Sequence, residues 1–267
     1  MVDPAGTGAL EAALRARRDT GGKCLVPYLT GGLGEWLSVL QAAAAAGADA
    51  VEVGIPFSDP VMDGPVIQEA SELALRAGAD PPAILDALGR TEVGVPTAVM
   101  TYANLVDRAG WTRFASSLAA AGVSGAILPD IPLEETGPWC AAADASGVET
   151  VLLAAPTAPD DRLERIVARS RGFVYAVGLL GVTGERSTLA DSATVIARRL
   201  KDVTDLPVLV GVGISTPEQA VEVCEVADGV VVGSAVVRRV LESGAGPASA
   251  EVVAELVASF RQALDAG

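Results

Sequence analysis

The chain alternates between two kinds of segment. Short apolar runs rich in β-branched residues are each followed by a polar or glycine-rich turn and then by an alanine-rich stretch of helical period. This alternation predicts parallel strands joined by helices. The expected strands are Cys24–Leu29, Ala48–Val53, Thr97–Thr101, Gly125–Leu128, Glu149–Leu153, Phe173–Val177, Val208–Gly211 and Gly229–Val232. Eight such strands can close into a (β/α)8 TIM barrel, an α/β fold.

The spacing of these runs supports a barrel of regular units. Most strand starts are separated by enough chain for one strand, one helix and two short loops, and only the second-to-third interval is longer. We expect the extra length to hold a long loop, Pro56–Ile67, which is too polar to be core. No Pro/Ser-rich linker or charge block divides the chain, so residues 1–267 are expected to form one domain.

Helix signals fit the same plan. Thr216–Gln219 places a capping hydroxyl, a first-turn proline and a glutamine at the positions of a capping box, directly after the seventh strand. Gln41–Ala46 is low in complexity, but the high helix propensity of alanine indicates a helix and not a linker. Ala9–Arg18 is predicted to be an extra amphipathic helix before the first strand.

Composition narrows the possible functions. Half of the 267 residues are apolar, which allows a sizeable core. The formal net charge of −15 disfavours nucleic acid and anionic membranes as partners, so an anionic ligand has to be held locally. The chain has no histidine, which excludes histidine triads, histidine metal sites and imidazole proton shuttles. Acid–base chemistry therefore falls mainly to Asp, Glu, Tyr or Lys, and no metal site is expected.

The cysteines and the N-terminus bear on location. Cys24, Cys140 and Cys224 are odd in number, widely spaced and set among apolar neighbours, which predicts reduced core thiols. The N-terminal residues Met1–Pro4 have no basic or apolar signal region, and no run of about 18 apolar residues occurs in the sequence. We therefore expect a cytoplasmic protein.

Two glycine-bearing turns follow the last two expected strands. Gly211–Ser215 follows the seventh strand, and Gly233–Ala235 follows the eighth and opens a helix. In TIM barrels these loops, together with a helix N-terminus, commonly bind phosphate through backbone N–H groups. Glycines at such turns also serve simply to permit positive φ angles, which is the better explanation of either turn alone. The two turns together favour a phosphate site.

A carboxylate interrupts the second expected strand. Glu52 lies in the apolar segment Ala50–Ile55, and both faces of a strand in a parallel barrel are covered. An unpaired carboxylate there is costly or has a raised pKa, so a glutamate at the C-terminal end of a barrel strand indicates a site residue. The alternative is a structural glutamate held by a lysine or a tyrosine.

Two further carboxylates follow in a stiff loop. Pro56–Pro65 contains three prolines and a glycine, and it carries Asp59 and Asp63 over the expected barrel mouth. In isolation both would be ordinary turn residues, since Asp-Pro and Asp-Gly are common turn pairs. Because they follow Glu52 directly, a functional role explains Asp59 and Asp63 as well as a turn role does.

These residues resemble the signature of the tryptophan synthase alpha-subunit family. The resemblance implies a (β/α)8 barrel that cleaves indole-3-glycerol phosphate to indole and glyceraldehyde 3-phosphate, in tryptophan biosynthesis. It covers nearly the whole chain in order. The matching segments are Glu52–Pro60, Asp63–Pro65, Tyr102–Asn104, Pro129–Pro132, Gly181–Gly184, Gly211–Ile214 and Gly233–Ala235.

The resemblance implies roles for individual residues. Glu52 corresponds to the general acid–base that moves protons between the glycerol hydroxyl and carbon 3 of the indole. Asp63 corresponds to the carboxylate that accepts a hydrogen bond from the indole N–H and stabilises its developing positive charge. Tyr175 matches a tyrosine beside the catalytic glutamate, and a core aromatic is almost as good an explanation of it.

Other matches concern the substrate. Thr183 lies in the loop after the sixth strand, which in the family closes over the site and approaches the second carboxylate. Four further residues match indole-pocket positions of the family, and packing in the protein core explains these four equally well. Phosphate contacts are implied for Gly184, Gly213, Gly233 and Ser234, a substrate contact for Tyr102, and indole-pocket positions for Tyr28, Ile67, Met100 and Ile127.

The resemblance also implies a partner. This is the pyridoxal-phosphate beta subunit, which receives the indole through a tunnel in an α2β2 complex, and no cofactor is expected in the present chain. Pro56, Asp59, Pro60 and Gly181 are expected at the contact.

Some features leave alternatives open. The sequence departs from the family pattern at Thr30–Gly34 and at Val177–Leu180, which puts the first-loop contacts and the closure of the sixth loop in doubt. Two other functions remain: a free-standing indole-3-glycerol-phosphate lyase, and a poor catalyst kept as an allosteric activator of a beta subunit.

Overall fold

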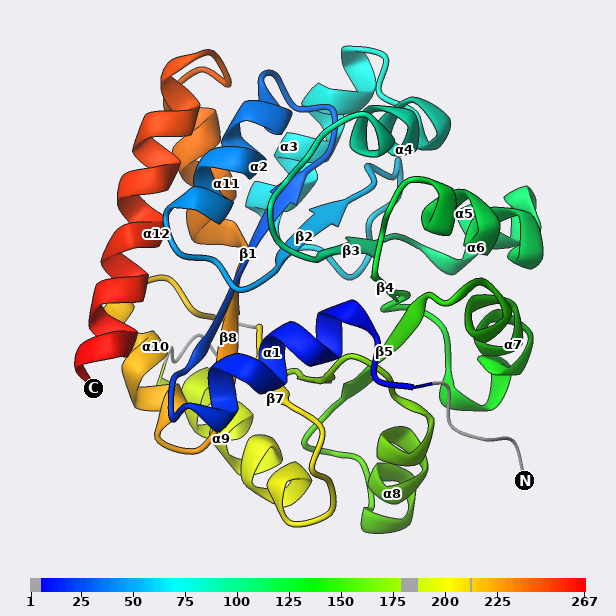
Figure 1. Cartoon of the computed structure of the whole chain (residues 1–267), viewed down its shortest axis with the longest axis vertical. Helices are drawn as coiled ribbons and strands as arrows, with labels where there is room; N and C mark the ends of the chain where they lie inside the picture. The colour runs from blue at the N-terminus through cyan, green and yellow to red at the C-terminus, as the bar shows by residue number, and fades with distance from the viewer. Residues whose placement is uncertain (1–5, 179–186, 212) are drawn as a thin grey trace.

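Eight parallel strands form a closed barrel. The structure is a computed structural model, which describes residues 6–178, 187–211 and 213–267. The strands follow one another around the ring in sequence order, and β8 pairs with β1 to close it (Figure 1). The strands are β1 (Cys24–Thr30), β2 (Val51–Gly54), β3 (Thr97–Met100), β4 (Gly125–Ile127), β5 (Glu149–Ala154), β6 (Val174–Ala176), β7 (Val208–Val210) and β8 (Gly229–Val232).

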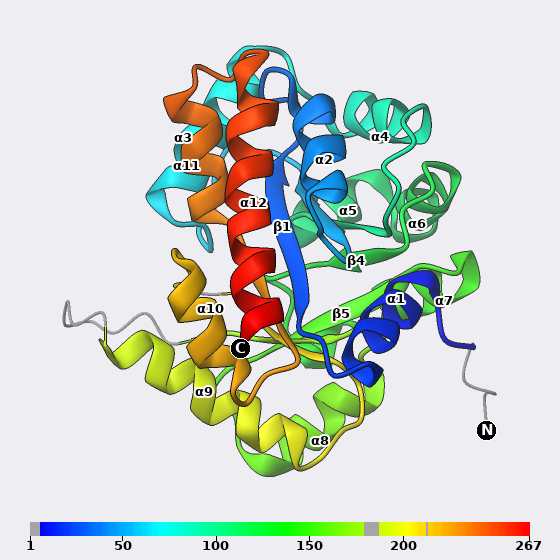
Figure 2. The same ribbon diagram turned by 60° about the vertical axis from the view of Figure 1, so that its left-hand side comes forward.

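Helices surround the strands, as the turned view of Figure 2 also shows. The predicted (β/α)8 barrel is thereby confirmed. The α-helices are α1 (Ala9–Asp19), α2 (Trp36–Ala45), α3 (Pro65–Arg76), α4 (Pro81–Gly89), α5 (Ala103–Ala109), α6 (Trp111–Ala120), α7 (Gly137–Ser146), α8 (Asp160–Arg169), α9 (Ser187–Lys201), α10 (Pro217–Cys224), α11 (Ser234–Glu242) and α12 (Ala248–Ala266). A short 3-10 helix, η1 (Leu133–Glu135), precedes α7.

The apolar runs become strands because the barrel covers them on both faces. All residues of β1 and β2 are buried, as expected for strands between a packed interior and a layer of helices. The prediction for the second strand began three residues too early, at Ala48. The chain is still turning there, after Gly47 at φ 108°, and Ala48 and Ala50 are buried without belonging to the strand.

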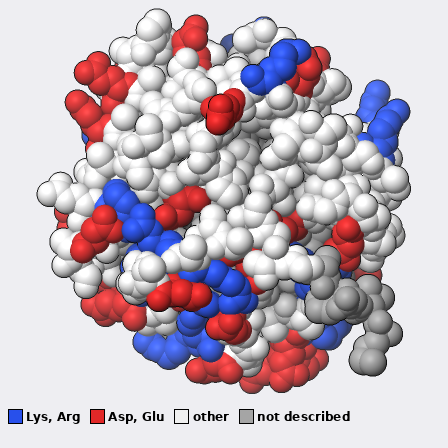
Figure 3. All heavy atoms as spheres, in the orientation of Figure 1, with Lys and Arg blue, Asp and Glu red and all other residues white. Residues whose placement is uncertain are grey.

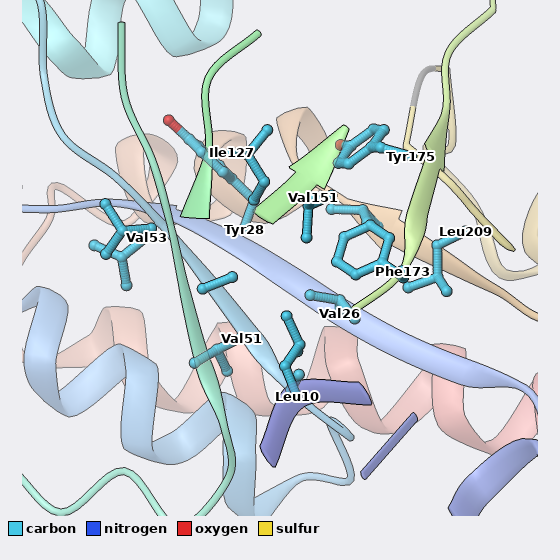
Figure 4. Packing of buried hydrophobic residues seen from close by; sticks show 14 of the residues in the cluster. Leu10, Val26, Tyr28, Val51, Val53, Ile127, Val151, Phe173, Tyr175 and Leu209 are labelled. Carbon is cyan, nitrogen blue, oxygen red and sulfur yellow. The ribbon is translucent and has the colours of Figure 1, made fainter. Parts of the chain in front are cut away.

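The predicted extra helix, α1, covers the N-terminal end of the barrel. Leu10 is fully buried and lies below the interior side chains of the barrel (Figure 4). The carboxylate of Glu149, at the start of β5, accepts hydrogen bonds from the backbone N–H groups of Leu10 at 2.8 Å and Glu11 at 2.9 Å. A side chain far along the sequence therefore satisfies the first N–H groups of this helix.

The segment after β2 is shorter as a loop than the sequence suggested. Pro65–Ile67, expected to be loop, forms the first turn of α3, with Gly64 at the N-cap and Pro65 at the first helical position. Proline suits this position because its missing N–H would have no helical partner there. The loop is residues 55–64, and much of the remaining extra length is taken by α4, whose start is capped by Asp80.

Several smaller predictions can also be compared with the structure. The capping box at Thr216 is confirmed, with both of its hydrogen bonds present. Cys24, Cys140 and Cys224 are buried free thiols, as predicted. Among the described helices, none is long and apolar enough to cross a membrane. Figure 3 shows acidic and basic side chains interspersed on one face of the molecule, without a single large basic patch.

Candidate active site

Glu52 lies inside the barrel, near its C-terminal end. It is 1% exposed and is in register with Tyr28 of β1. The negative charge of Glu52 also raises the pKa of Tyr175 of β6, a strand on the opposite side of the closed ring. Groups on opposite strands can face one another only across the interior. Glu52 and Tyr175 therefore both point inward.

The environment of Glu52 favours its protonated form. Neither carboxylate oxygen has a hydrogen-bond partner among the described residues. Burial raises the pKa of Glu52 to about 8, and the negative charge of Asp63 contributes in the same direction. The structural alternative, a glutamate held by a lysine or tyrosine, would require a partner that these residues do not provide. A carboxyl group of this kind can both give and take a proton near neutral pH.

Asp63 lies at the end of the loop after β2, at the mouth of the barrel. It is half-buried, and burial raises its pKa, whereas a hydrogen bond with the Tyr102 side chain lowers it. The two carboxyl groups therefore occupy different environments, since Glu52 is enclosed without a partner among the described residues and Asp63 is partly open. Such a difference separates the roles of two acids in one site.

Two tyrosines contribute to the same end of the interior. Tyr28 and Tyr175 project toward one end, opposite Leu10 (Figure 4). Burial raises the pKa of Tyr175 well above its usual value, and the nearby charge of Glu52 adds to the effect. Glycines make room for both rings: a Cβ atom at Gly54 would overlap the Tyr28 hydroxyl, and one at Gly211 would overlap the Tyr175 hydroxyl.

The two glycine turns lie at the C-terminal ends of β7 and β8. Gly213 has φ 83°, a left-handed conformation that favours glycine, and it is exposed. Gly233 is the N-cap of α11, so Ser234 begins that helix, and no side chain among the described residues caps it. The first N–H groups of α11 are thus left for a ligand, in the geometry that binds phosphate at helix N-termini.

Two of the expected indole-pocket residues adjoin the eighth turn, and the other two lie on the strands that follow β2 around the ring. A Cβ atom at Gly233 would lie 3.7 Å from Ile67 Cδ1 and 3.8 Å from Tyr28 Cβ, so the eighth turn adjoins both residues. Met100 and Ile127 are in register on β3 and β4, where Met100 also pairs with Gly54, two residues after Glu52. Ile127 is fully buried, and Met100 is half-buried.

Not all expected site residues can be placed. Thr183 and Gly184, and Gly181 of the expected interface, lie outside the described residues. In the loop after β2, Asp59 is exposed and Pro60 half-exposed, whereas Pro56 is buried. Pro56 is therefore suited to stiffen the loop and not to touch a partner.

Other surface features do not compete with this site. Among the described residues, no group of His, Cys, Asp or Glu side chains could hold a metal ion. A groove of about 840 Å³ lies between α4, α5 and α6. The carboxylate that lines it, Asp86, is exposed and forms an ion pair with Arg90. The enclosed carboxyl group and the open helix N-terminus occur together only at the barrel mouth, in the part of the chain described.

Comparison with known proteins agrees with this geometry. A family model described as tryptophan synthase alpha chain matches residues 14–265, nearly the whole chain. The chain belongs to the tryptophan synthase alpha chain family. A tryptophan synthase alpha chain of Streptomyces coelicolor is 44% identical over 256 residues, which cover 94% of each protein. One of Salinispora arenicola is 47% identical over 232 residues, or 84% of this chain and 86% of the relative.

Solved structures extend the comparison to the fold. A chain of Mycobacterium tuberculosis tryptophan synthase is 37% identical and superposes with a TM-score of 0.88, covering 98% of this chain and 100% of that one. The tryptophan synthase alpha subunit of Legionella pneumophila is 30% identical, with a TM-score of 0.87 and the same coverage. The resemblance first noted in short motifs therefore extends over nearly the whole chain and its fold.

Sequence reasoning assigned no role to two residues of this site. The Asp130 carboxylate accepts the N–H of Ala103 at 2.9 Å and 3.2 Å, which holds the start of α5 next to Tyr102. Phe57 stacks on Tyr102, with ring centroids 4.9 Å apart. Asp130 belongs to the Pro129–Pro132 motif, which indicated that this segment matters. Only the fold shows that its carboxylate caps the start of α5.

Proposed function

We propose that the chain is the alpha subunit of tryptophan synthase, a carbon–carbon lyase that cleaves indole-3-glycerol phosphate to indole and glyceraldehyde 3-phosphate. The observation that carries the proposal is Glu52, enclosed in the barrel without a partner among the described residues and with a pKa raised to about 8. It is largely protonated at neutral pH, so it is ready to act first as an acid. Family membership supports the choice of substrate.

In this proposal Glu52 moves both protons of the reaction. Its carboxyl group protonates carbon 3 of the indole, which leaves a positive charge on the ring. The carboxylate so formed then removes the proton of the substrate hydroxyl on the carbon next to the ring. As that hydroxyl becomes an aldehyde, the bond between this carbon and carbon 3 breaks and its electron pair returns to the ring. Indole and glyceraldehyde 3-phosphate result, and Glu52 is protonated again.

Asp63 and the glycine turns complete the proposed site. Asp63 accepts a hydrogen bond from the indole N–H and stabilises the charge of the protonated ring. Ser234, Gly233 and Gly213 bind the phosphate through backbone N–H groups, with help from the dipole of α11. Tyr28, Ile67, Met100 and Ile127 surround the indole, and Tyr175 lies beside Glu52. This arrangement explains how a chain of net charge −15 can bind an anionic ester.

The proposal includes a partner and a location. Val61 and Met62 are large apolar side chains that remain 81% and 53% exposed at the tip of the loop after β2, next to Asp59 and Pro60. Exposed apolar residues beside an active site are typical of a docking surface. We assign this tip to the beta subunit of an α2β2 complex, which carries the pyridoxal phosphate. The three buried thiols favour a cytoplasmic location.

Indole release from indole-3-glycerol phosphate tests the assignment. Glu52→Gln keeps the shape of the side chain and removes its proton transfer, so we expect turnover to fall by about 10³-fold or more. Asp63→Asn should lower turnover by about 10²-fold, through loss of the charge beside the indole N–H. Glu69→Gln, the same change at an exposed position of α3, is the control. Activity of Glu52→Gln within a few-fold of the parent would reject the mechanism.

The same assay separates the alpha-subunit role from a free-standing lyase. Turnover should rise when a beta subunit is added to the wild-type chain. High turnover that the beta subunit leaves unchanged would support the free-standing enzyme instead. Absence of cleavage under both conditions, with beta-subunit turnover increased, would support the purely allosteric role.

A further inference from the structure

The loop after β2 ends in a tight turn. The N–H of Asp63 donates to the carbonyl oxygen of Pro60 at 3.1 Å, which closes residues 60–63 into a turn. The N–H of Met62 donates to the Tyr102 hydroxyl group at 3.0 Å. The carbonyl oxygen of Asp63, in contrast, accepts no backbone N–H of the described residues. Its hydrogen bond is therefore left to a side chain or to water.

Gln68 of α3 supplies this hydrogen bond. Its side-chain amide donates to the Asp63 carbonyl oxygen at 2.8 Å, a good hydrogen-bond length. The same nitrogen atom lies 3.5 Å from the carbonyl oxygen of Pro60, where it makes a weaker second contact. Asp63 is thus bonded through both its N–H and its C=O. Its backbone is fixed on both sides, and with it the direction in which the carboxylate leaves the chain.

The helix that carries Gln68 is a firm base. Its first turn is closed by the Gly64 carbonyl oxygen, which accepts the N–H groups of Ile67 and Gln68, both at 3.0 Å. On its inner face Ala70 and Ala74 are fully buried. The helix packs against β1 and α11, and it lies beside α11 in both views (Figure 1, Figure 2). Since α11 begins at the proposed phosphate turn, α3 is attached to that part of the site.

Two consecutive residues of α3 contact both parts of the site. Ile67 adjoins Gly233, since a Cβ atom at Gly233 would lie 3.7 Å from the Cδ1 atom of Ile67. Gln68 holds the backbone of Asp63. We propose that Gln68 is a positioning residue, which fixes the Asp63 carboxylate relative to the phosphate turn. The inference rests on the proposed cleavage reaction. Gln68 itself is exposed and acts through Asp63, not on the reacting atoms.

Loss of the Gln68 donor should affect catalysis more than substrate binding. Without it, the Asp63 carbonyl oxygen bonds to water and the end of the loop gains freedom, so the carboxylate spends less time beside the indole N–H. Asp63 stabilises a positive charge that exists only while the ring is protonated. The phosphate turns, which bind the substrate, keep their structure. The loss therefore belongs to kcat, and KM should change little.

Gln68→Met tests the proposal. Methionine has the length and the helix propensity of glutamine but no donor. In cleavage of indole-3-glycerol phosphate by the full chain, we expect kcat to fall by about fivefold to tenfold, with KM changed by less than about twofold. Gln41→Met is the matched control. Gln41 is also exposed, and it donates to the backbone carbonyl oxygen of Glu92 at 2.9 Å, in the loop before β3 and at the other end of the barrel. The kcat of this control should equal that of the parent.

A double-mutant cycle shows whether Gln68 acts through Asp63. Asp63→Ala removes the carboxylate, so its orientation no longer matters, and adding Gln68→Met should then lower kcat by less than about twofold. If Gln68→Met lowers kcat as much without the carboxylate as with it, the inference is overturned. An unchanged kcat in Gln68→Met alone, or an equal loss in Gln41→Met, would overturn it as well. Each of these results leaves the proposed reaction intact, whereas absence of cleavage by the parent would refute the proposed function.

Discussion

At the scale of single residues, the barrel holds its carboxylates in contrasting ways. Asp49 accepts the backbone N–H of Leu25 and the guanidinium group of Arg17, and Asp228 accepts the backbone N–H of Val208 and the ammonium group of Lys201. These acids lie at the N-terminal ends of the strands and have partners. Glu52, near the opposite end, has none among the described residues. Glu52 thus lowers the stability of the fold at the position where the proposed reaction needs a proton donor.

This contrast predicts that Glu52→Gln is more stable than the parent at high pH. The pKa of Glu52 in the folded protein, about 8, lies above the usual value of 4.5, so the folded state keeps a proton that the unfolded chain loses. The free energy of unfolding of the parent should therefore decrease between those two pH values. Glutamine carries no charge, so the variant should gain about 4 kcal/mol at pH 8 and about 1 kcal/mol or less near pH 5.

Urea unfolding at a series of pH values measures this difference. Glu69→Gln makes the same substitution at an exposed position and should follow the parent at every pH. A constant difference between Glu52→Gln and the parent would show that the carboxyl group does not titrate in this range, against the pKa that supports the mechanism.

At the scale of secondary-structure elements, α1 shows how one helix closes the end of the barrel away from the site. It begins without a side-chain cap of its own, and the Glu149 carboxylate from β5 supplies the missing acceptors for Leu10 and Glu11. Leu10 fills the space next to Gly125 and Gly172. The helix is thus attached by a polar contact and an apolar contact at the same place. The polar contact requires β5, and the apolar contact requires β4 and the segment before β6, to be in their barrel positions.

Glu149→Ala should loosen this helix. The substitution leaves two backbone N–H groups unsatisfied and a small cavity, so we expect a loss of about 2–3 kcal/mol in the free energy of unfolding. Amide hydrogen exchange should increase first in residues 9–19, because only α1 loses its acceptor. The control Glu222→Ala, at an exposed position of α10, should stay within about 0.5 kcal/mol of the parent. Unchanged exchange in α1 would contradict this account of its attachment.

At the scale of the whole molecule, the two ends of the barrel differ in what they expose. The N-terminal end is covered by α1 and contains paired charges. The C-terminal end carries Glu52, Asp63, the two glycine turns and the exposed side chains of Val61 and Met62. This division is general in TIM barrels, where one end supports stability and the other binds and reacts. A partner that receives a product should therefore dock at the C-terminal end.

Val61→Asp should weaken binding of the beta subunit, because it places a charge in an apolar contact. We expect the dissociation constant to rise about tenfold or more, with turnover of the isolated chain nearly unchanged. Val203→Asp is the matched control, since Val203 is an exposed valine at the other end of the barrel, beyond α9. Equal effects of the two substitutions in a calorimetric titration would remove the loop tip from the interface.

The sequence by itself determined the order of the strands, the helical segments and the capping box at Thr216. These features follow from hydrophobic period and from contacts between near neighbours, which are local properties of the chain. The start of β2 was misplaced because the alanines of the preceding turn are buried like strand residues, and the start of α3 was misplaced because proline can begin a helix as well as end one.

Only the tertiary structure decided the chemistry of the site. The sequence predicted that Glu52 is enclosed, but only the folded barrel shows that its carboxylate has no partner among the described residues and that the charge of Asp63 is close enough to raise its pKa further. Asp130 meets Ala103 across 27 residues of chain, and Glu149 meets Leu10 across 139. A carboxylate thus becomes an acid–base candidate, a helix cap or a structural anchor according to what the closed barrel places next to it.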